Sequence, residues 1–269
     1  MLVEELVRLQ LESLRLSDMA RALSGVCERV GRIEGSYLDF LAELLETEVN
    51  GRYERQVGTK TRLSGLPYHK TMADFDFSFQ PSIDKRQIAE LLTLRFIESA
   101  ENVLLLGPPV VGKTPIAVAL AAEAIAKGYN VYFVTLPSLV SYLSEGKDEA
   151  VNRMRLLLRP KLLIIDEVGY LPLGREEANW LFELVSRRYE RGAIILTSNK
   201  SYGDWASLFP DIALAAAILD RLLHHSTPIN IRGDSYRLKD KRRSGVFQKL
   251  DTLTQNPTGE FQIGVFGEK

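Results

Sequence analysis

A short run of residues at the end of a buried strand constrains this chain more than any other feature. Residues 103–106 are apolar throughout, and Gly-Pro-Pro-Val-Val-Gly-Lys-Thr follows at 107–114. This octapeptide fits the pattern G-x-x-x-x-G-K-[ST] at every position, and a helical pattern of small residues follows it to about Lys127. A strand, a glycine turn and a helix in this order predict a loop whose backbone N–H groups converge on phosphate.

The residue types in this loop suit a nucleoside triphosphate. Glycine lets the backbone approach phosphate oxygens without a Cβ in the way, and the helix N-terminus adds partial positive charge. We expect Lys113 to neutralise the β- and γ-phosphates of ATP and Thr114 to ligate Mg²⁺. The residues assigned to ATP binding are Gly107, Pro108, Pro109, Val110, Val111, Gly112, Lys113, Thr114 and Pro115.

From residue 82 onward, apolar strands alternate with helical segments. Continuous apolar strands joined by helices predict a parallel sheet covered on both faces, so the expected fold class is α/β. We expect strands at 103–106, 130–136, 161–166, 192–199 and 228–232, helices at 83–99, 113–127 and 175–191, and helical segments within 138–158 and 211–223.

Polar residues follow two of these strands. Asp166 and Glu167 end LLIIDE, and Asn199 ends IILTSN. Because parallel sheets bind ligands at the carboxyl ends of their strands, we expect these residues beside the phosphate loop. Asp166 would hold Mg²⁺, Glu167 would polarise the attacking water, and Asn199 would hydrogen-bond that water or the γ-phosphate. Consecutive strand residues point to opposite faces, so the two carboxylates should not share one task.

The chain before residue 82 has a different organisation. Residues 1–66 show a helical period and predict a small all-helical domain, in which Ser17 is suited to cap a second helix. Ser36 and Asp39 resemble a capping box for a third helix over 37–49. Residues 67–81 form a connector whose phenylalanines predict an ordered strap. The ATPase domain would then span 82–232, followed by a basic tail, 233–269.

Composition excludes several classes of protein. Net charge is −1, and the single cysteine of the 269 residues excludes an intramolecular disulfide. No apolar run approaches the roughly 18 residues of a membrane-spanning helix, and the N-terminus does not resemble a signal peptide, so we expect a cytoplasmic protein without a membrane partner. His69, His224 and His225 lack the spacing of a metal set, and adjacent histidines on a helix should point in different directions.

Two interpretations stay open for Arg221, which lies in the helical stretch ILDRLLHHS. It would serve as an arginine finger that enters the nucleotide site of a neighbouring subunit and stabilises charge on the transferring phosphoryl group. Alternatively, it is a solvated helix arginine paired with Asp220 or with nearby acids.

The stretches GPPVVGKT, LLIIDE, ILTSN and DRLLHHS…INIRGDSYRLK together resemble the AAA+ ATPases of the IstB/DnaC group, and within it the IstB-type transposition helpers. The resemblance covers nearly the whole chain. It implies an AAA+ sheet of order 5-1-4-3-2 and ATP-dependent self-association on double-stranded DNA. It also implies a transposase partner, help in target-site selection, and the finger role for Arg221.

The chain departs from the family pattern at three places. Similar proteins usually have Gly at the position of Val110 and His at that of Pro115, which puts nucleotide affinity in question. After residue 232 we find no helical period for a full lid with a second sensor arginine, for which Arg237 is a candidate substitute.

Basic residues gather in three segments that are candidates for phosphate contacts with DNA. The tail has six cations against one acid over 237–249, and the resemblance favours the second segment, 147–161. The third segment lies beside the N-terminal helices and contains Arg52, Arg55, Lys60 and Arg62. No base-reading module is evident, so we expect backbone contacts and DNA deformation. The residues assigned to DNA binding are Lys147, Arg153, Arg155, Arg237, Lys239, Lys241, Arg242 and Arg243.

The favoured function is an ATP-driven, DNA-remodelling oligomer that assists an insertion-sequence transposase. The alternative is a replicative helicase loader, which shares the same core and would differ in the partner of its N-terminal domain. A nucleotide-dependent scaffold that does not hydrolyse ATP is disfavoured by Glu167. A small-molecule kinase is disfavoured by the Asn199 strand and the Arg221 helix.

Overall fold

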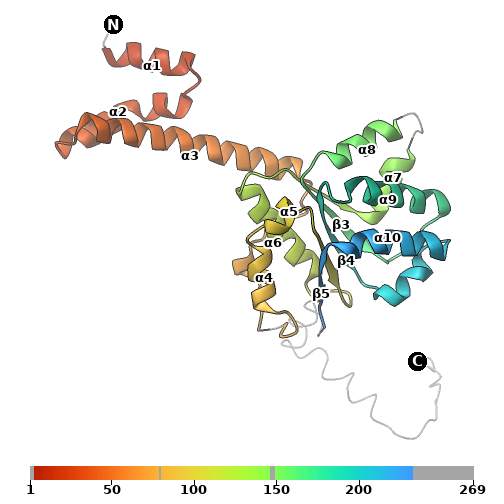
Figure 1. Cartoon of the computed structure of the whole chain (residues 1–269). Coiled ribbons are helices and arrows are strands. Elements are labelled where there is room, and N and C mark those ends of the chain that lie inside the picture. The colour runs from red at the N-terminus through yellow and green to blue at the C-terminus, as the bar shows by residue number, and fades with distance from the viewer. Residues whose placement is uncertain (1–2, 79, 146–148, 233–269) are drawn as a thin grey trace, which may run out of the picture.

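The computed structural model describes residues 3–78, 80–145 and 149–232. Three helices form an arm that projects from an α/β body (Figure 1). The arm consists of α1 (Val3–Ser13), α2 (Ser17–Arg32) and the long α3 (Tyr37–Leu63), with α1 and α2 at the end far from the body. A small apolar core, centred on Leu23, Val26 and Leu44, holds α2 against α3.

The start of α2 is capped from another helix. Ser17, the expected cap, is the first residue of α2, and the residue before it makes no side-chain cap. Instead, Glu48 of α3 accepts hydrogen bonds from the backbone amides of Asp18 and Met19, at 2.9 and 3.2 Å. Burial alone would raise the pKa of Glu48, but hydrogen bonds from Arg52 and from these two amides hold that pKa below its ordinary value. Sequence reasoning missed this cap because it depends on a residue thirty positions away.

The expected capping box of Ser36 and Asp39 is present at the start of α3. The helix then continues past residue 49, the expected end, to Leu63. Gly51 does not interrupt it, and a Cβ at Gly51 would lie 2.2 Å from the Asp18 carboxylate, so this glycine permits the close approach of α2.

The far part of α3 is attached to the body by hydrogen bonds. The Tyr53 hydroxyl donates to the carbonyl of Ala126 at 3.1 Å, and Lys60 donates to the carbonyl of Gly128. The backbone N–H of Phe133 donates to the carbonyl of Ser64 at 2.7 Å. The arm therefore continues directly into the edge of the central sheet.

Five parallel strands form that sheet, in the order β2-β3-β4-β1-β5. This is the expected order 5-1-4-3-2 seen from the other edge, so the sheet prediction is confirmed. The apolar runs of the central strands are buried along their whole length because helices cover both faces. The strands are β1 (Asn102–Leu106), β2 (Val131–Thr135), β3 (Leu162–Val168), β4 (Ala193–Ser198) and β5 (Ser226–Asn230).

The two faces of the sheet carry separate apolar cores. One core lies under α6 (Lys113–Ala126), α4 (Lys85–Leu91), α5 (Arg95–Glu98) and the connector. The other lies under α7 (Leu136–Ser144), α8 (Ala150–Leu158), α9 (Arg175–Arg188) and α10 (Ile212–His224). Two 3₁₀ segments complete the body, η1 (Met72–Asp74) and η2 (Tyr202–Leu208). Within the described residues, no helix has the length and apolar character needed to cross a bilayer.

The expected single helix over 83–99 is two helices. Leu94 adopts a left-handed conformation, φ 63°, and separates α4 from α5. At 100° per residue, a continuous helix would turn Leu94 and Phe96 to nearly opposite sides. The break lets both side chains enter the same core.

A buried arginine joins the layers on the α9 side. Arg188 donates hydrogen bonds of 2.9–3.2 Å to the carbonyls of Leu157, Pro160, Lys161 and Ala193. Burial lowers the pKa of its guanidinium to about 10. The arginine thus donates hydrogen bonds to buried carbonyl groups at the end of α8 and at the starts of β3 and β4.

We expect Arg188→Leu to lower the free energy of unfolding by about 2–4 kcal/mol, because it leaves these buried carbonyls without their donor. Arg187→Leu is the matched control, since Arg187 pairs with Glu183 on the surface and should cost less than about 1 kcal/mol. Thermal unfolding of both variants measures the difference. Equal melting temperatures would show that Arg188 is not a structural anchor.

Candidate functional site

The phosphate loop connects β1 to α6 through three residues with positive φ. Gly107 has φ 148°, Val110 has φ 66° and Gly112 has φ 106°. A Cβ at Gly107 would lie 2.1 Å from the carbonyl oxygen of Ile231, so only glycine fits beside the chain that leaves β5. Val110 is the strained position expected from its β-branched side chain. The loop backbone therefore turns sharply between β1 and α6 at these three residues.

Lys113 lies inside this loop. Its Nζ donates to the carbonyls of Gly107 and Pro108 at 2.8 and 2.6 Å, and the residue is buried. Burial lowers the pKa of Lys113, and the charge of Asp166 opposes that shift. The ammonium group is thus fixed close to the backbone that would surround a phosphate.

Three side chains from three elements meet beside the lysine. Thr114 Oγ1, at the start of α6, lies 2.9 and 3.1 Å from the two carboxylate oxygens of Asp166 on β3. The hydroxyl of Thr197 on β4 donates to the same carboxylate. These are the hard oxygen ligands that Mg²⁺ prefers. Two neighbouring oxygens of a magnesium octahedron lie about 2.9 Å apart, so Thr114 and Asp166 fit the metal that the sequence predicts.

Glu167 departs from regular strand geometry. It has φ 64°, and the pairing of β3 with β4 shifts register between Ile165 and Val168. Strict alternation would direct Asp166 and Glu167 to opposite faces, but both border the same cavity. The irregularity of β3 therefore lies between the two acids, and it leaves both at the wall of one cavity. Asp166 is buried and Glu167 is exposed, so one is suited to fixed ligation and the other to contact with water.

The end of β4 contributes differently from the prediction. Thr197 borders the cavity and accepts a hydrogen bond from the Glu167 backbone N–H at 3.1 Å. Asn199 is half-buried beside Gly169 and is not among the residues that border the cavity. Its Oδ1 is a buried atom without a hydrogen-bond partner. No hydrogen bond joins Asn199 to Asp166 or Glu167 among the described residues.

The cavity has a volume of 680 Å³, and the connector forms part of its wall. Burial, and secondarily the charge of Asp166, raises the pKa of Tyr68. The ring of Phe75 packs over Gly112, where a Cβ would lie 3.1 Å from a ring carbon. Sequence analysis predicted an ordered connector but had no signal for the face it covers. The connector residues that border the cavity are Pro67, Tyr68, Lys70 and Phe75. The residues of the phosphate loop and of α6 that border it are Val110, Gly112, Lys113, Thr114 and Pro115.

Arg221 lies outside the cavity. Its guanidinium is 4.9 Å from the ring centroid of Phe182 and donates to the carbonyl of Ala217 at 2.8 Å. The described part of the chain shows no ion pair between Arg221 and Asp220. Arg221 is therefore not positioned to act on the nucleotide of its own subunit.

The expected DNA-binding residues occupy different environments. Arg153 donates to the carbonyl of Tyr142 at 2.8 Å and pairs with Glu149 at 3.0 Å, so it connects α7 to α8. Arg155 is exposed on α8. In the third basic segment, Arg52 and Arg55 pair with acids of the arm. Lys147, Arg237, Lys239, Lys241, Arg242 and Arg243 lie outside the described residues.

Sequence comparisons find relatives that are named for ATP binding and for insertion sequences. Residues 9–244 match the family described as IstB-like ATP binding protein. A Pseudomonas aeruginosa protein, named for insertion sequence IS21 and for ATP binding, is 46% identical over 90% of this chain and 92% of its own. A Geobacillus stearothermophilus protein, named in the same way for IS5376, is 48% identical over 88% of this chain and 95% of its own.

Solved structures resemble the body of the protein. The crystal structure of DnaI covers 62% of this chain and 89% of its own, with a TM-score of 0.52 and 22% identity. The AMPPCP-bound DnaA of Aquifex aeolicus covers 68% of this chain and 57% of its own, with a TM-score of 0.51 and 20% identity. These similarities establish the AAA+ fold.

We expect Lys113→Ala to weaken ATP binding by about 10- to 100-fold, because it removes a charge-assisted hydrogen bond to phosphate. Lys127→Ala, at the opposite end of the same helix, is the matched control and should bind as the wild type does. Titration with a fluorescent ATP analogue measures both affinities. Unchanged affinity in Lys113→Ala would refute the assignment of the loop.

Proposed function

The chain belongs to the family of IstB-like ATP binding proteins, and we propose that this AAA+ ATPase assists the transposase of an insertion sequence by assembling on DNA. The relatives support the ATPase and the link to insertion sequences. The observation that carries the chemistry is the meeting of Thr114, Asp166 and Thr197 beside the phosphate loop.

Each residue of the site has a distinct proposed task in hydrolysis. Lys113 and the loop amides would bind the phosphates, while Thr114 and Asp166 would hold Mg²⁺, which would supply positive charge to the phosphate groups. Glu167 accepts a proton from the attacking water, for which its exposed position at the cavity wall is suited. Asn199 would reach the water or the γ-phosphate only after its side chain turns toward the cavity.

We expect Glu167→Gln to bind ATP normally but to lower kcat by about 10²- to 10⁴-fold, because an amide cannot accept the proton. The variant should therefore stay assembled on DNA in the presence of ATP. Glu176→Gln is the control, since Glu176 is an exposed acid of α9 away from the cavity. Phosphate release and DNA co-sedimentation test both properties, and normal turnover in Glu167→Gln would remove the residue from this role.

We propose that Arg221 completes the site of a neighbouring subunit. It lies in the last turn of α10, outside its own cavity, and its side chain is held by Phe182 rather than by an acid. Because the Arg221 guanidinium contacts an aromatic ring and not a carboxylate, it is available to bind a phosphate in the site of another subunit. Self-association would then be required for efficient hydrolysis.

We expect Arg221→Ala to retain ATP binding while hydrolysis by the assembly falls by about 10³-fold or more, since an arginine finger stabilises only the transition state. In assemblies mixed from the Arg221→Ala and Glu167→Gln proteins, each subunit carries only one of the two substitutions. Partial recovery of turnover is expected, because Arg221 of one subunit would serve the intact Glu167 of the next. Absence of recovery in stable mixed assemblies would contradict the proposal.

We propose that DNA is bound through phosphate contacts without base reading. Of the two assigned residues that the structure describes, Arg155 is exposed and suits this task, whereas Arg153 already bonds to the protein. Contacts of this kind predict binding that weakens steeply with salt and varies little with sequence. Residues 233–269 and Lys147 remain candidates from sequence.

The partner of the arm distinguishes transposition from helicase loading. The similarity to DnaI concerns the fold and does not favour a loader, whereas the insertion-sequence relatives favour a transposase. Capture experiments should offer the full chain an insertion-sequence transposase and, separately, a replicative helicase. Retention of the helicase alone would favour the loader.

A further inference from the structure

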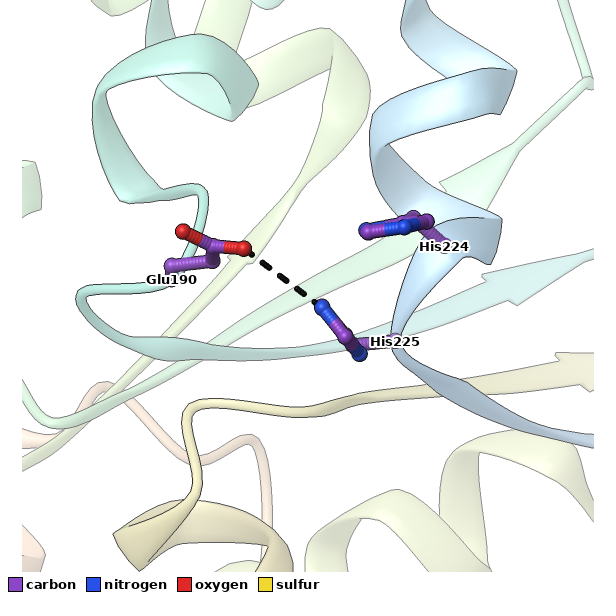
Figure 2. A group of neighbouring side chains, drawn as sticks. All are labelled: Glu190, His224 and His225. Atoms are coloured by element: carbon purple, nitrogen blue, oxygen red, sulfur yellow. Dashed lines mark ion pairs between the residues drawn. The ribbon is translucent and has the colours of Figure 1, made fainter.

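Glu190, His224 and His225 lie close together on the surface, and all three follow the phosphate loop by many residues in the sequence (Figure 2). Glu190 lies in the turn between α9 and β4, His224 is the last residue of α10, and His225 follows it. Their ligand atoms all lie within 4.8 Å of one another, and all three residues are exposed. This is the one such group of three in the ranges that the structure describes.

Within a continuous helix, His224 and His225 would point in different directions, as we expected from the sequence. The structure differs because the helix ends between them. His225 has φ −123° and ψ 87°, outside helical values, and the two ring centroids are 4.1 Å apart. Both rings therefore lie on the side that faces Glu190.

Neighbouring groups orient the rings. The Tyr189 hydroxyl lies 2.5 Å from His224 Nδ1, which leaves Nε2 as the nitrogen open to a ligand. His225 Nε2 lies 3.4 Å from Glu190 Oε1. A hydrogen bond to the second ring nitrogen is the usual support for a histidine that binds metal.

The local electrostatics favour a cation. Glu190 contributes negative charge, and the carbonyls at the C-terminus of the 13-residue α10 contribute partial negative charge. The nearby Arg221 is directed onto the ring of Phe182, on α9. A divalent ion at this position would therefore meet two nitrogen donors, one carboxylate and a favourable helix end.

We propose that Glu190, His224 and His225 form a binding site for a transition metal of the zinc class. Two imidazoles and one carboxylate are a known zinc donor set, and water would complete the coordination. Donors around zinc lie about 3.4 Å apart, which rotation of these exposed side chains can reach. The bound ion would join the α9–β4 turn to the end of α10. The site is separate from the nucleotide cavity and does not depend on the proposed function.

Zinc titration of the full chain tests the site. Calorimetry is performed with chelator-treated protein in excess Mg²⁺, so that the oxygen ligands at Asp166 are not available to zinc. We expect the wild type to bind one zinc ion that Glu190→Gln and His225→Ala each lose or weaken by at least about 100-fold. Tyr189→Phe should weaken it by about 10-fold, because only the support of His224 is removed.

The matched control is His69→Ala, since His69 is an exposed histidine of the connector outside this group. It should bind zinc as the wild type does, and zinc should raise the melting temperature of both proteins but not of His225→Ala. Equal zinc binding in all variants, equal weakening by His69→Ala, or no binding by the wild type would each overturn the proposal. Circular dichroism verifies that the variants fold.

Discussion

The carboxylate of Asp166 is the contact on which the arrangement of this site depends. It accepts hydrogen bonds from Thr114 and Thr197, and so joins the first turn of α6 to the ends of β3 and β4. Because Asp166 is buried, removal of either threonine hydroxyl would leave the desolvated carboxylate with one hydrogen bond fewer. The three elements are thereby aligned at one edge of the sheet, where the loop amides, the lysine and the second acid also lie.

The connector adds a wall to the cavity at this edge of the sheet. Residues that leave α3 pair with the edge strand β2 through Ser64, and the chain then passes beside the phosphate loop, where Phe75 packs on Gly112. Farther on, Ser82 accepts a hydrogen bond from the backbone of Arg232, next to β5. The segment therefore extends from one edge of the sheet to the other, and it places Tyr68 and Lys70 at the cavity.

Much of the fold follows from local sequence. The phosphate loop, the apolar strands and the position of Asp166 at a strand end could be predicted because each depends on residues close together in the chain, whereas the sheet order was implied by the family resemblance. Glu167 shows the limit: its left-handed backbone and the register shift arise from pairing with β4, which no local pattern encodes. The same reason explains why Glu48 replaced Ser17 as a cap, and why Thr197 rather than Asn199 borders the cavity. The histidine pair was misjudged because the end of α10 falls within it.

The attachment of α3 has a mechanical consequence. Hydrogen bonds from Tyr53 and Lys60 fix the helix to the C-terminal end of α6, whose other end begins at the phosphate loop. At 1.5 Å per residue, the part of α3 before Tyr53 extends about 24 Å from this support, so a tilt of about 5° displaces its tip by about 2 Å. A rotation of α6 at this support would therefore be amplified along α3 and would displace α1 and α2 at the far end of the arm.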